Sequence, residues 1–227
     1  MDLEIAVAPL HIGVDLDNTI ICFNPVFLQL ARACGWVGPN QSMNHRELRR
    51  LLIAADGNDH RWQWLQGQVY GSRIADAAPF DGVIAVLRRW RQNGYRVTVV
   101  SHKTRYSNWD PSIALREAAT QWLSRHQLFD QGSAYSLVDD VFFEANLSDK
   151  LARIRQLGCN IFVDDKLSVL TDRQFPCETV PAYFAPHEAV PQPARAPQHR
   201  QQCVPHQPRE RRTPRQLPAG RGGQRRF

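Results

Sequence analysis

The sequence lacks the cysteine pattern of a disulfide framework or a zinc site. Its five cysteines are odd in number, widely spaced and include no Cys-x-x-Cys pair. Small secreted domains and zinc modules depend on paired cysteines, so neither class is indicated and a reducing compartment fits best. The sequence also has no apolar run of about 18 residues, and no basic segment followed by an apolar one. We therefore expect a soluble cytoplasmic protein without a membrane partner.

An excess of basic charge is missing from most of the chain, although the whole sequence has a formal net charge of +6. Residues 187–227 hold nine arginines and two glutamates, which leaves 19 basic and 20 acidic side chains in the rest. Residues 186–227 are rich in Pro, Arg and Gln and poor in large apolar residues, a composition that predicts a disordered tail. Its arginines could bind nucleic acid electrostatically. A shifted reading frame past the end of the domain would give the same composition, so we do not favour a nucleic-acid partner.

Polar residues that could bind a metal ion or take part in catalysis follow the first apolar run. Ile12–Val14 predicts a buried strand, and Asp15, Asp17 and Thr19 come directly after it. Acids two residues apart in an extended chain lean the same way and repel each other unless a cation lies between them. Carboxylate oxygens are ligands that Mg²⁺ prefers. Asp and Thr are also ordinary turn residues, so this pattern needs support from the rest of the chain.

Strands alternating with helices predict an α/β fold. Residues 24–78 have apolar residues at helical spacing and no convincing strand, so they predict a helical insert. From Pro79, strands over 95–100, 141–143, 160–163 and about 178–184 alternate with helices, three of which we expect to be capped by Asp81, Asp110 and Ser148. This order is typical of a doubly wound, Rossmann-like parallel sheet. We predict an α/β core from 1–23 and 79–185, an insert at 24–78 and a tail at 186–227.

Polar side chains follow several of these strands. Ligands of such sheets bind outside the carboxyl ends of the strands. Asp15, Ser101 and Asp164 all fall there. Along the chain, the polar residues come in the order Asp15-x-Asp17-x-Thr19, then Ser101, then Lys150, then the Asp164-Asp165 pair. This order resembles the four motifs of the haloacid dehalogenase (HAD) superfamily. The resemblance covers residues 10–185, and the insert after the first motif resembles a small cap domain of that superfamily.

The resemblance implies a Mg²⁺-dependent hydrolase that removes phosphate from a phosphomonoester. Asp15 would be the nucleophile that becomes an aspartyl phosphate, and Asp17 the general acid and base. An acid at position 17 favours phosphoester hydrolysis over cleavage of a carbon–halogen bond. The other implied roles are Mg²⁺ binding by Asp15, the Asp17 main-chain carbonyl, Asp164 and Asp165, and binding of phosphoryl oxygens by Thr19, Ser101 and Lys150. Lys103 or Lys166 could take the role of Lys150.

Specificity is less well defined by the sequence. The loop after Ser101 carries Lys103, Arg105, Tyr106 and Trp109, which could clamp the leaving group of a small phosphorylated substrate, or Trp109 could simply anchor the loop. We expect the insert to act as a lid over the site. A phosphomutase or phosphotransferase of the same superfamily remains open, as does a non-catalytic module whose basic tail binds nucleic acid. The sequence does not identify the substrate.

Overall fold

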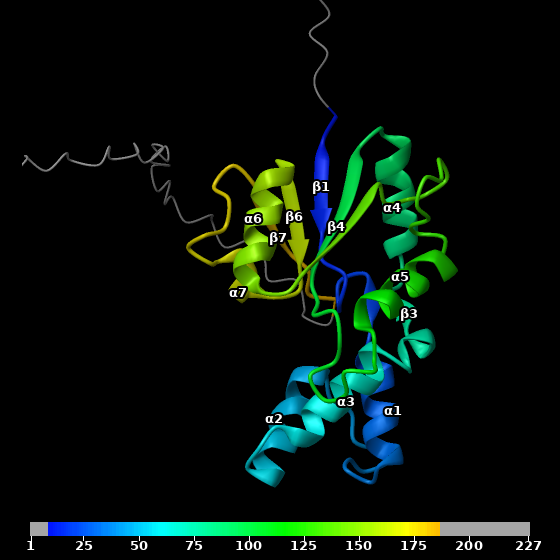
Figure 1. Cartoon of the computed structure of the whole chain (residues 1–227), viewed down its shortest axis with the longest axis vertical. Coiled ribbons are helices and arrows are strands. Elements are labelled where there is room, and N and C mark those ends of the chain that lie inside the picture. Colours follow the sequence, from blue (N-terminus) through cyan, green and yellow to red (C-terminus); the bar gives the residue numbers. More distant parts are fainter. Residues whose placement is uncertain (1–8, 187–227) are drawn as a thin grey trace, which may run out of the picture. The chain divides into compact units, whose positions relative to one another are not determined.

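The computed structural model describes residues 9–186, so the predictions about the arginine-rich tail at 187–227 lie outside the described residues. Its centre is a sheet of five parallel strands in the order β5-β4-β1-β6-β7 (Figure 1). The strands are β1 (His11–Val14), β4 (Arg96–His102), β5 (Asp140–Glu144), β6 (Ile161–Asp164) and β7 (Val180–Tyr183). The chain runs outward from β1 through β4 to β5 and then crosses to the other side of β1. A crossover of this kind is typical of a doubly wound sheet.

Helices cover both faces of this sheet, and the side chains of β4 show the alternation. The helices are α4 (Val83–Gln92), α5 (Leu115–Arg125), α6 (Leu147–Leu157) and α7 (Leu167–Leu170). Val99 of β4 is buried in one core with Leu87 of α4 and Trp122 of α5. Val100, which points to the opposite face, is buried in a second core with Ile154 of α6. The predicted α/β class is confirmed. None of the helices in residues 9–186 is long and apolar enough to cross a membrane.

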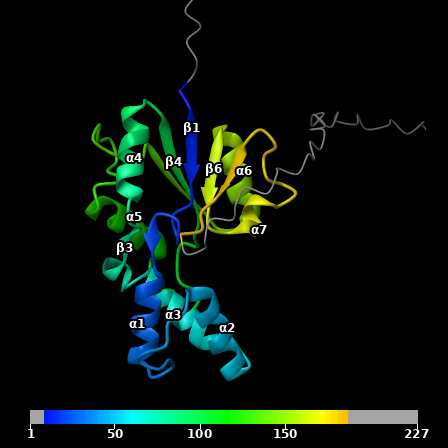
Figure 2. The same ribbon diagram turned by 180° about the vertical axis from the view of Figure 1, so that it is seen from behind.

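The predicted insert is helical. Between β1 and α4 come β2 (Ile21–Cys22), α1 (Asn24–Ala33), α2 (His45–Asp56), α3 (His60–Tyr70), a 3₁₀ turn (Ile74–Asp76) and β3 (Ala78–Pro79). The strands β2 and β3 pair antiparallel, with Ile21 opposite Pro79, and so join the two ends of the insert. Both views place α1, α2 and α3 together, beyond the carboxyl ends of the central strands (Figures 1 and 2). The helices therefore stand at the edge of the sheet where ligands are expected.

Three predicted helix caps are wrong. The residue before α4 is Gly82 rather than Asp81, and no side chain caps this helix. The helix expected to start at Asp110 begins instead at Leu115, and the Asp110 carboxylate accepts hydrogen bonds from the backbone N–H and hydroxyl of Ser112 in a local turn. In α6 the cap is Asn146 rather than Ser148, because the Asn146 side chain accepts the Asp149 N–H at 2.9 Å. Short polar side chains satisfy nearby N–H groups in turns as readily as at caps, so their sequence position alone does not separate the two.

A glycine in β1 allows the sheet and the second core to approach closely. A Cβ at Gly13 would lie 2.5 Å from Cδ2 of Phe162 and 2.9 Å from Sγ of Cys159, both of which are buried. We expect Gly13→Ala to destabilise the fold by about 1–3 kcal/mol, because a methyl group added to a well-packed core forces its neighbours to shift. Urea unfolding of the variant and the wild type measures this.

Gly38→Ala is the matched control, because a Cβ there meets nothing closer than 3.5 Å. Equal unfolding midpoints for Gly13→Ala and Gly38→Ala would contradict the assigned close approach.

Candidate active site

The register of the sheet brings the predicted residues to one place. Val14 pairs with Val99 of β4 on one side and Val163 of β6 on the other. Asp15 extends this arrangement, since its N–H donates to the Val163 carbonyl at 2.8 Å. It therefore lies between the end of β4, which carries Ser101, and the end of β6, which carries Asp164. Leu16, between Asp15 and Asp17, is completely buried.

Lys150 joins two of the acids. Its ammonium donates to Oδ1 of Asp15 and to Oδ2 of Asp164, both at 2.6 Å. The side chain is only 2% exposed, so these ion pairs are shielded from water. Lys150 lies near the start of α6, where the Asn146 cap fixes the first turn. The two carboxylates and the cap thus hold the ammonium at the carboxyl edge of the sheet.

The combined effect of burial and neighbouring charges raises the pKa values of Lys150, Asp164 and Asp165. Burial lowers the pKa of Lys150, but the charges of Asp15 and Asp164 outweigh it and leave the pKa raised. Burial and the nearby charge of Asp15 raise the pKa of Asp164, against the opposing effect of Lys150. The same two causes raise the pKa of Asp165 to about 6. The carboxylates are therefore crowded, and a further cation would favour their ionised forms.

The donor set fits a divalent cation. Carboxylate oxygens of Asp15, Asp164 and Asp165 lie within 4.8 Å of one another, and all three residues are buried. Oxygen ligands gathered this closely suit Mg²⁺. The Asp17 side chain is not part of this group of three.

Four buried oxygen atoms in the same region lack a hydrogen-bond partner within residues 9–186. They are Oδ1 of Asp17, Oγ1 of Thr19, Oγ of Ser101 and Oδ1 of Asp165. An unpartnered buried polar atom costs on the order of 1–3 kcal/mol, so folded proteins have few of them. Asp17 and Thr19 follow Asp15 along the chain, Ser101 lies at the end of the adjacent β4, and Asp165 is one of the grouped carboxylates, so a polar ligand bound here would complete their hydrogen bonding.

The three candidate lysines have different environments. Lys150 contacts Asp15, whereas the Lys103 ammonium contacts Oδ2 of Asp17 at 2.8 Å and is 3% exposed. The Lys103 ammonium also lies 4.7 Å from the centroid of the Tyr70 ring in α3, a cation–π contact. Lys166 is exposed. Lys103 therefore links Asp17 to the insert, a contact that the sequence did not indicate.

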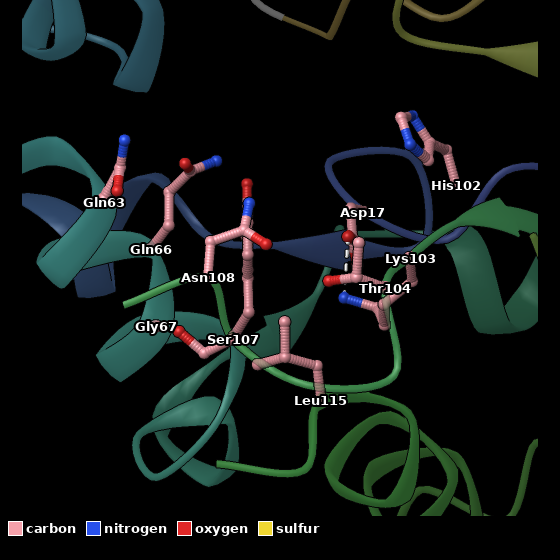
Figure 3. Close-up of a pocket in the computed structure, with 11 residues that line it drawn as sticks. Asp17, Gln63, Gln66, Gly67, His102, Lys103, Thr104, Ser107, Asn108 and Leu115 are labelled. Carbon is pink, nitrogen blue, oxygen red and sulfur yellow. Dashed lines mark hydrogen bonds and ion pairs between the residues drawn. The ribbon is translucent and has the colours of Figure 1, made fainter. Parts of the chain in front are cut away.

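A pocket of about 130 Å³ opens beside Asp17 and Lys103. Figure 3 shows Gln63 and Gln66 of α3 on one side, with Asp17, Lys103 and Thr104 on the other. The remaining lining residues are Gly67, Tyr70, His102, Ser107, Asn108 and Leu115. Sequence reasoning missed the α3 residues. A signal was present, because positions 63, 66 and 70 have the spacing of residues that share one helix face.

The loop after Ser101 lines this pocket, but apart from Lys103 the lining residues differ from those that the sequence predicted. Thr104, Ser107 and Asn108 line the pocket, whereas Arg105, Tyr106 and Trp109 are not among its lining residues. Tyr106 and Trp109 are 43% and 46% exposed. The Trp109 ring lies 6.4 Å from that of His60 in α3, so it contacts the insert.

The insert also contacts the acids through the start of α2. The Arg46 guanidinium donates to the main-chain carbonyl of Asp165 and to its Oδ2. The neighbouring His45 packs inward, with Nδ1 donating to Oδ1 of Asn24 at 2.8 Å and its ring stacked on Phe27. Burial is the main cause that lowers the pKa of His45 to about 4, followed by the positive charges of Arg46 and Lys166.

Comparisons with known proteins find similar solved structures. No protein-family model matches the chain, and no curated protein matches it. A HAD-superfamily hydrolase from Ehrlichia chaffeensis is 16% identical, with 78% of this chain and 88% of that one covered at a TM-score of 0.45. A "predicted phosphatase" from Clostridium acetobutylicum is 12% identical, with 75% and 83% covered at a TM-score of 0.48. A HAD-family enzyme from Bacteroides thetaiotaomicron, in complex with magnesium and inorganic phosphate, is 10% identical, with 81% and 97% covered at 0.40.

Two of these three structures carry the name of the superfamily that the four motifs resemble. At these TM-scores the likeness assigns no role to any residue of this chain. The roles of the site residues therefore rest on the contacts described above.

The burial of His45 predicts a loss of stability at acid pH. The pKa of His45 in the folded chain is about 4, below its ordinary value of 6.5, so between these pH values the unfolded chain binds a proton that the folded chain excludes. The stabilisation is complete above the unfolded pKa and is lost as the pH falls toward 4. Between pH 7 and pH 4.5 we expect the wild type to lose about 2 kcal/mol more of its free energy of unfolding than His45→Gln does. Urea unfolding of both proteins at the two pH values measures this, and parallel losses would contradict it.

Proposed function

We propose that the chain is a Mg²⁺-dependent phosphatase that acts on small-molecule phosphomonoesters through an aspartyl-phosphate intermediate. The observation that supports this most is the close grouping of Asp15, Asp164 and Asp165, the first two of which contact the buried Lys150. The hydroxyls of Thr19 and Ser101, at the ends of the adjacent β1 and β4 segments, are unpartnered. Carboxylates, a shielded ammonium and free hydroxyl donors are the groups that phosphoryl transfer requires close together.

Asp15 is the proposed nucleophile. A carboxylate oxygen of Asp15 attacks phosphorus, and the bond between phosphorus and the leaving oxygen breaks as the bond to Asp15 forms. Lys150 lies beside this carboxylate and, with the Thr19 and Ser101 hydroxyls, would bind the oxygens of the transferring group. These donors are held by the sheet and by α6 before substrate arrives, so little reorganisation is needed when charge moves.

Asp17 is the proposed general acid and base. It stands on the pocket side of the site, where the leaving group would lie. In its protonated form it gives its proton to the leaving oxygen. As a carboxylate it then takes a proton from the water that attacks the phosphorus of the aspartyl phosphate, which releases phosphate and restores Asp15. The contact with Lys103 holds the Asp17 side chain in place for both steps.

Bound Mg²⁺ would neutralise charge on the phosphoryl group, with Asp15, Asp164, Asp165 and the Asp17 main-chain carbonyl as its proposed ligands. The unpartnered Oδ1 of Asp165 is available for such a role.

The helical insert at 24–78 is the proposed cap of a core formed by 1–23 and 79–185. It supplies Gln63, Gln66 and Tyr70 to the pocket and touches Asp165 through Arg46. A wall of this kind limits the size of the leaving group and excludes water from the transferring phosphoryl group. Small phosphorylated molecules, rather than folded phosphoproteins, are the substrates that such a site would admit.

The test is release of phenol from a generic aryl phosphate, with Mg²⁺ and with a chelator in its place. We expect turnover only with Mg²⁺, and a loss of roughly 10³-fold or more in kcat for Asp15→Asn, because the nucleophile is removed. Steady-state kinetics give kcat, and circular dichroism checks that the variant is folded.

Asp81→Asn is the matched control, since it removes the same charge from an exposed position before α4. Its kcat should equal that of the wild type. Equal turnover by Asp15→Asn and wild type, or turnover that persists in the chelator, would refute the proposed mechanism.

A further inference from the structure

A second, wider cleft adjoins the pocket beside Asp17. It has a volume of about 680 Å³, within the roughly 300–1,000 Å³ usual for small-molecule sites. The two spaces share four lining residues, Gln63, Gln66, Tyr70 and Asn108. A molecule that places its phosphoryl group at Asp15 therefore has a continuous path from Asp17 along α3 into the cleft.

The far wall of this cleft is strongly basic. Arg46, Arg49 and Arg50 of α2 line it, together with Lys166 from the core. Arg46 is paired with Asp165. No acidic side chain within residues 9–186 lies within the ion-pair distance of 4.0 Å from Arg49, Arg50 or Lys166. The cleft thus keeps three cations that form no ion pair within residues 9–186.

The local structure of α2 holds these arginines in the cleft. The helix begins with a capping box, in which Asn44 accepts the N–H groups of Arg46 and Glu47 while Glu47 accepts that of Asn44. Leu48 and Leu52 are buried within the insert. Positions 46, 49 and 50 lie on the opposite side of the helix, because residues three and four apart share a face. The Arg46 contact with Asp165 then docks this face against the core.

The acidic side chain that lines the cleft, Asp59, is hydrogen-bonded to a neighbour on α3. Asp59 accepts a hydrogen bond from Nε2 of Gln63 at 2.9 Å. Like charges four positions apart on a helix repel, as those of Arg46 and Arg50 do, so an anion bound between them would relieve this repulsion. Guanidinium groups present a planar fork of donors that matches phosphate oxygens. Three unmatched cations suit a dianionic phosphate better than a single carboxylate.

We propose that the cleft is a subsite for a second phosphate group, so that the preferred substrate is a small molecule bearing two phosphates. The phosphate at Asp15 would be removed, and the other would bind Arg49 and Arg50, with Lys166 adding charge from the core side. This inference rests on the proposed phosphatase activity for the identity of the first phosphate. The anion-binding subsite itself is tested below without turnover.

The probes are alkane-α,ω-bisphosphonates of increasing chain length, each compared with the alkyl monophosphonate of the same length. These compounds are not hydrolysed. The chain length that binds most tightly indicates the distance between the two phosphate positions. Binding to the full-length chain is measured by calorimetry with Mg²⁺ at 0.15 M salt. We expect at least one bisphosphonate to bind about tenfold or more tightly than its monophosphonate, because hydrogen bonds to charged groups are strong.

The diagnostic variant is the double substitution R49Q/R50Q. It should abolish the advantage of the bisphosphonate while leaving monophosphonate binding within about twofold of wild type. The matched control is R88Q/R89Q, which removes the same charge from two exposed arginines of α4, outside the cleft. The control should keep the advantage, which separates a local subsite from a general effect of net charge.

Aryl phosphate turnover, measured on the same proteins, separates the two proposals. R49Q/R50Q should leave kcat for this singly phosphorylated substrate unchanged. If no bisphosphonate binds more tightly than its monophosphonate, or if the advantage survives in R49Q/R50Q, the second-phosphate subsite is refuted, whether or not the aryl phosphate is hydrolysed. If the advantage is lost in R49Q/R50Q only, the subsite stands even where turnover is absent, and it is then the phosphatase proposal that fails.

Discussion

The candidate site depends on how the fold tolerates several carboxylates at one edge of its sheet. Asp15, Asp164 and Asp165 are buried together, and charges removed from water repel strongly. Lys150 offsets this by contacting two of them from the first turn of α6, and Arg46 contacts the third from the insert. Breaking a buried ion pair leaves an uncompensated charge, which makes such contacts strict constraints on the position of each element. The strand register, the cap of α6 and the docking of α2 all serve this arrangement.

The same contacts connect the insert to the acids. Arg46 reaches Asp165 from α2, and Tyr70 of α3 packs against the Lys103 ammonium that contacts Asp17. Movement of α2 away from the core would therefore break the contact of Arg46 with Asp165. Movement of α3 would remove Tyr70 from the Lys103 ammonium that contacts Asp17. If the insert closes as a lid, closing would bring Arg46 to Asp165 and place Tyr70 against the Lys103 ammonium that contacts Asp17, so closure would be coupled to the electrostatics of both acids. We infer that the insert contributes to the chemistry as well as to the shape of the pocket.

Much of the fold could be predicted because the strands of a parallel sheet are apolar runs, and their ends are marked by polar residues such as Asp15, Ser101 and Asp164. Strand order and register then bring these positions together without further information. The caps were harder: Asp110 and Asn146 are both short polar residues, and only the surrounding backbone decides which one starts a helix. The partner of Asp17 could not be predicted either, since Lys103 reaches it from another strand and Tyr70 from the insert. Contacts of this kind depend on how two segments pack, and no periodicity within either segment encodes them.

The unpartnered oxygens are the clearest departure of this structure from ordinary packing. Most of the buried polar side chains at the site find partners, as Asp15, Asp164 and Lys150 do, whereas Thr19 and Ser101 leave their hydroxyls free. A free hydroxyl buried in a core costs stability, and a small rotamer change or a substitution by Val or Ala would remove that cost. Here the free atoms lie next to the crowded carboxylates instead of being scattered over the described chain. A cation would offset the charge that crowds the carboxylates, and a phosphate bound beside it would accept hydrogen bonds from both hydroxyls and from Lys150. A metal ion and a phosphate ester, the ligands proposed for this site, would together offset the crowded charge and accept the hydrogen bonds of these hydroxyls.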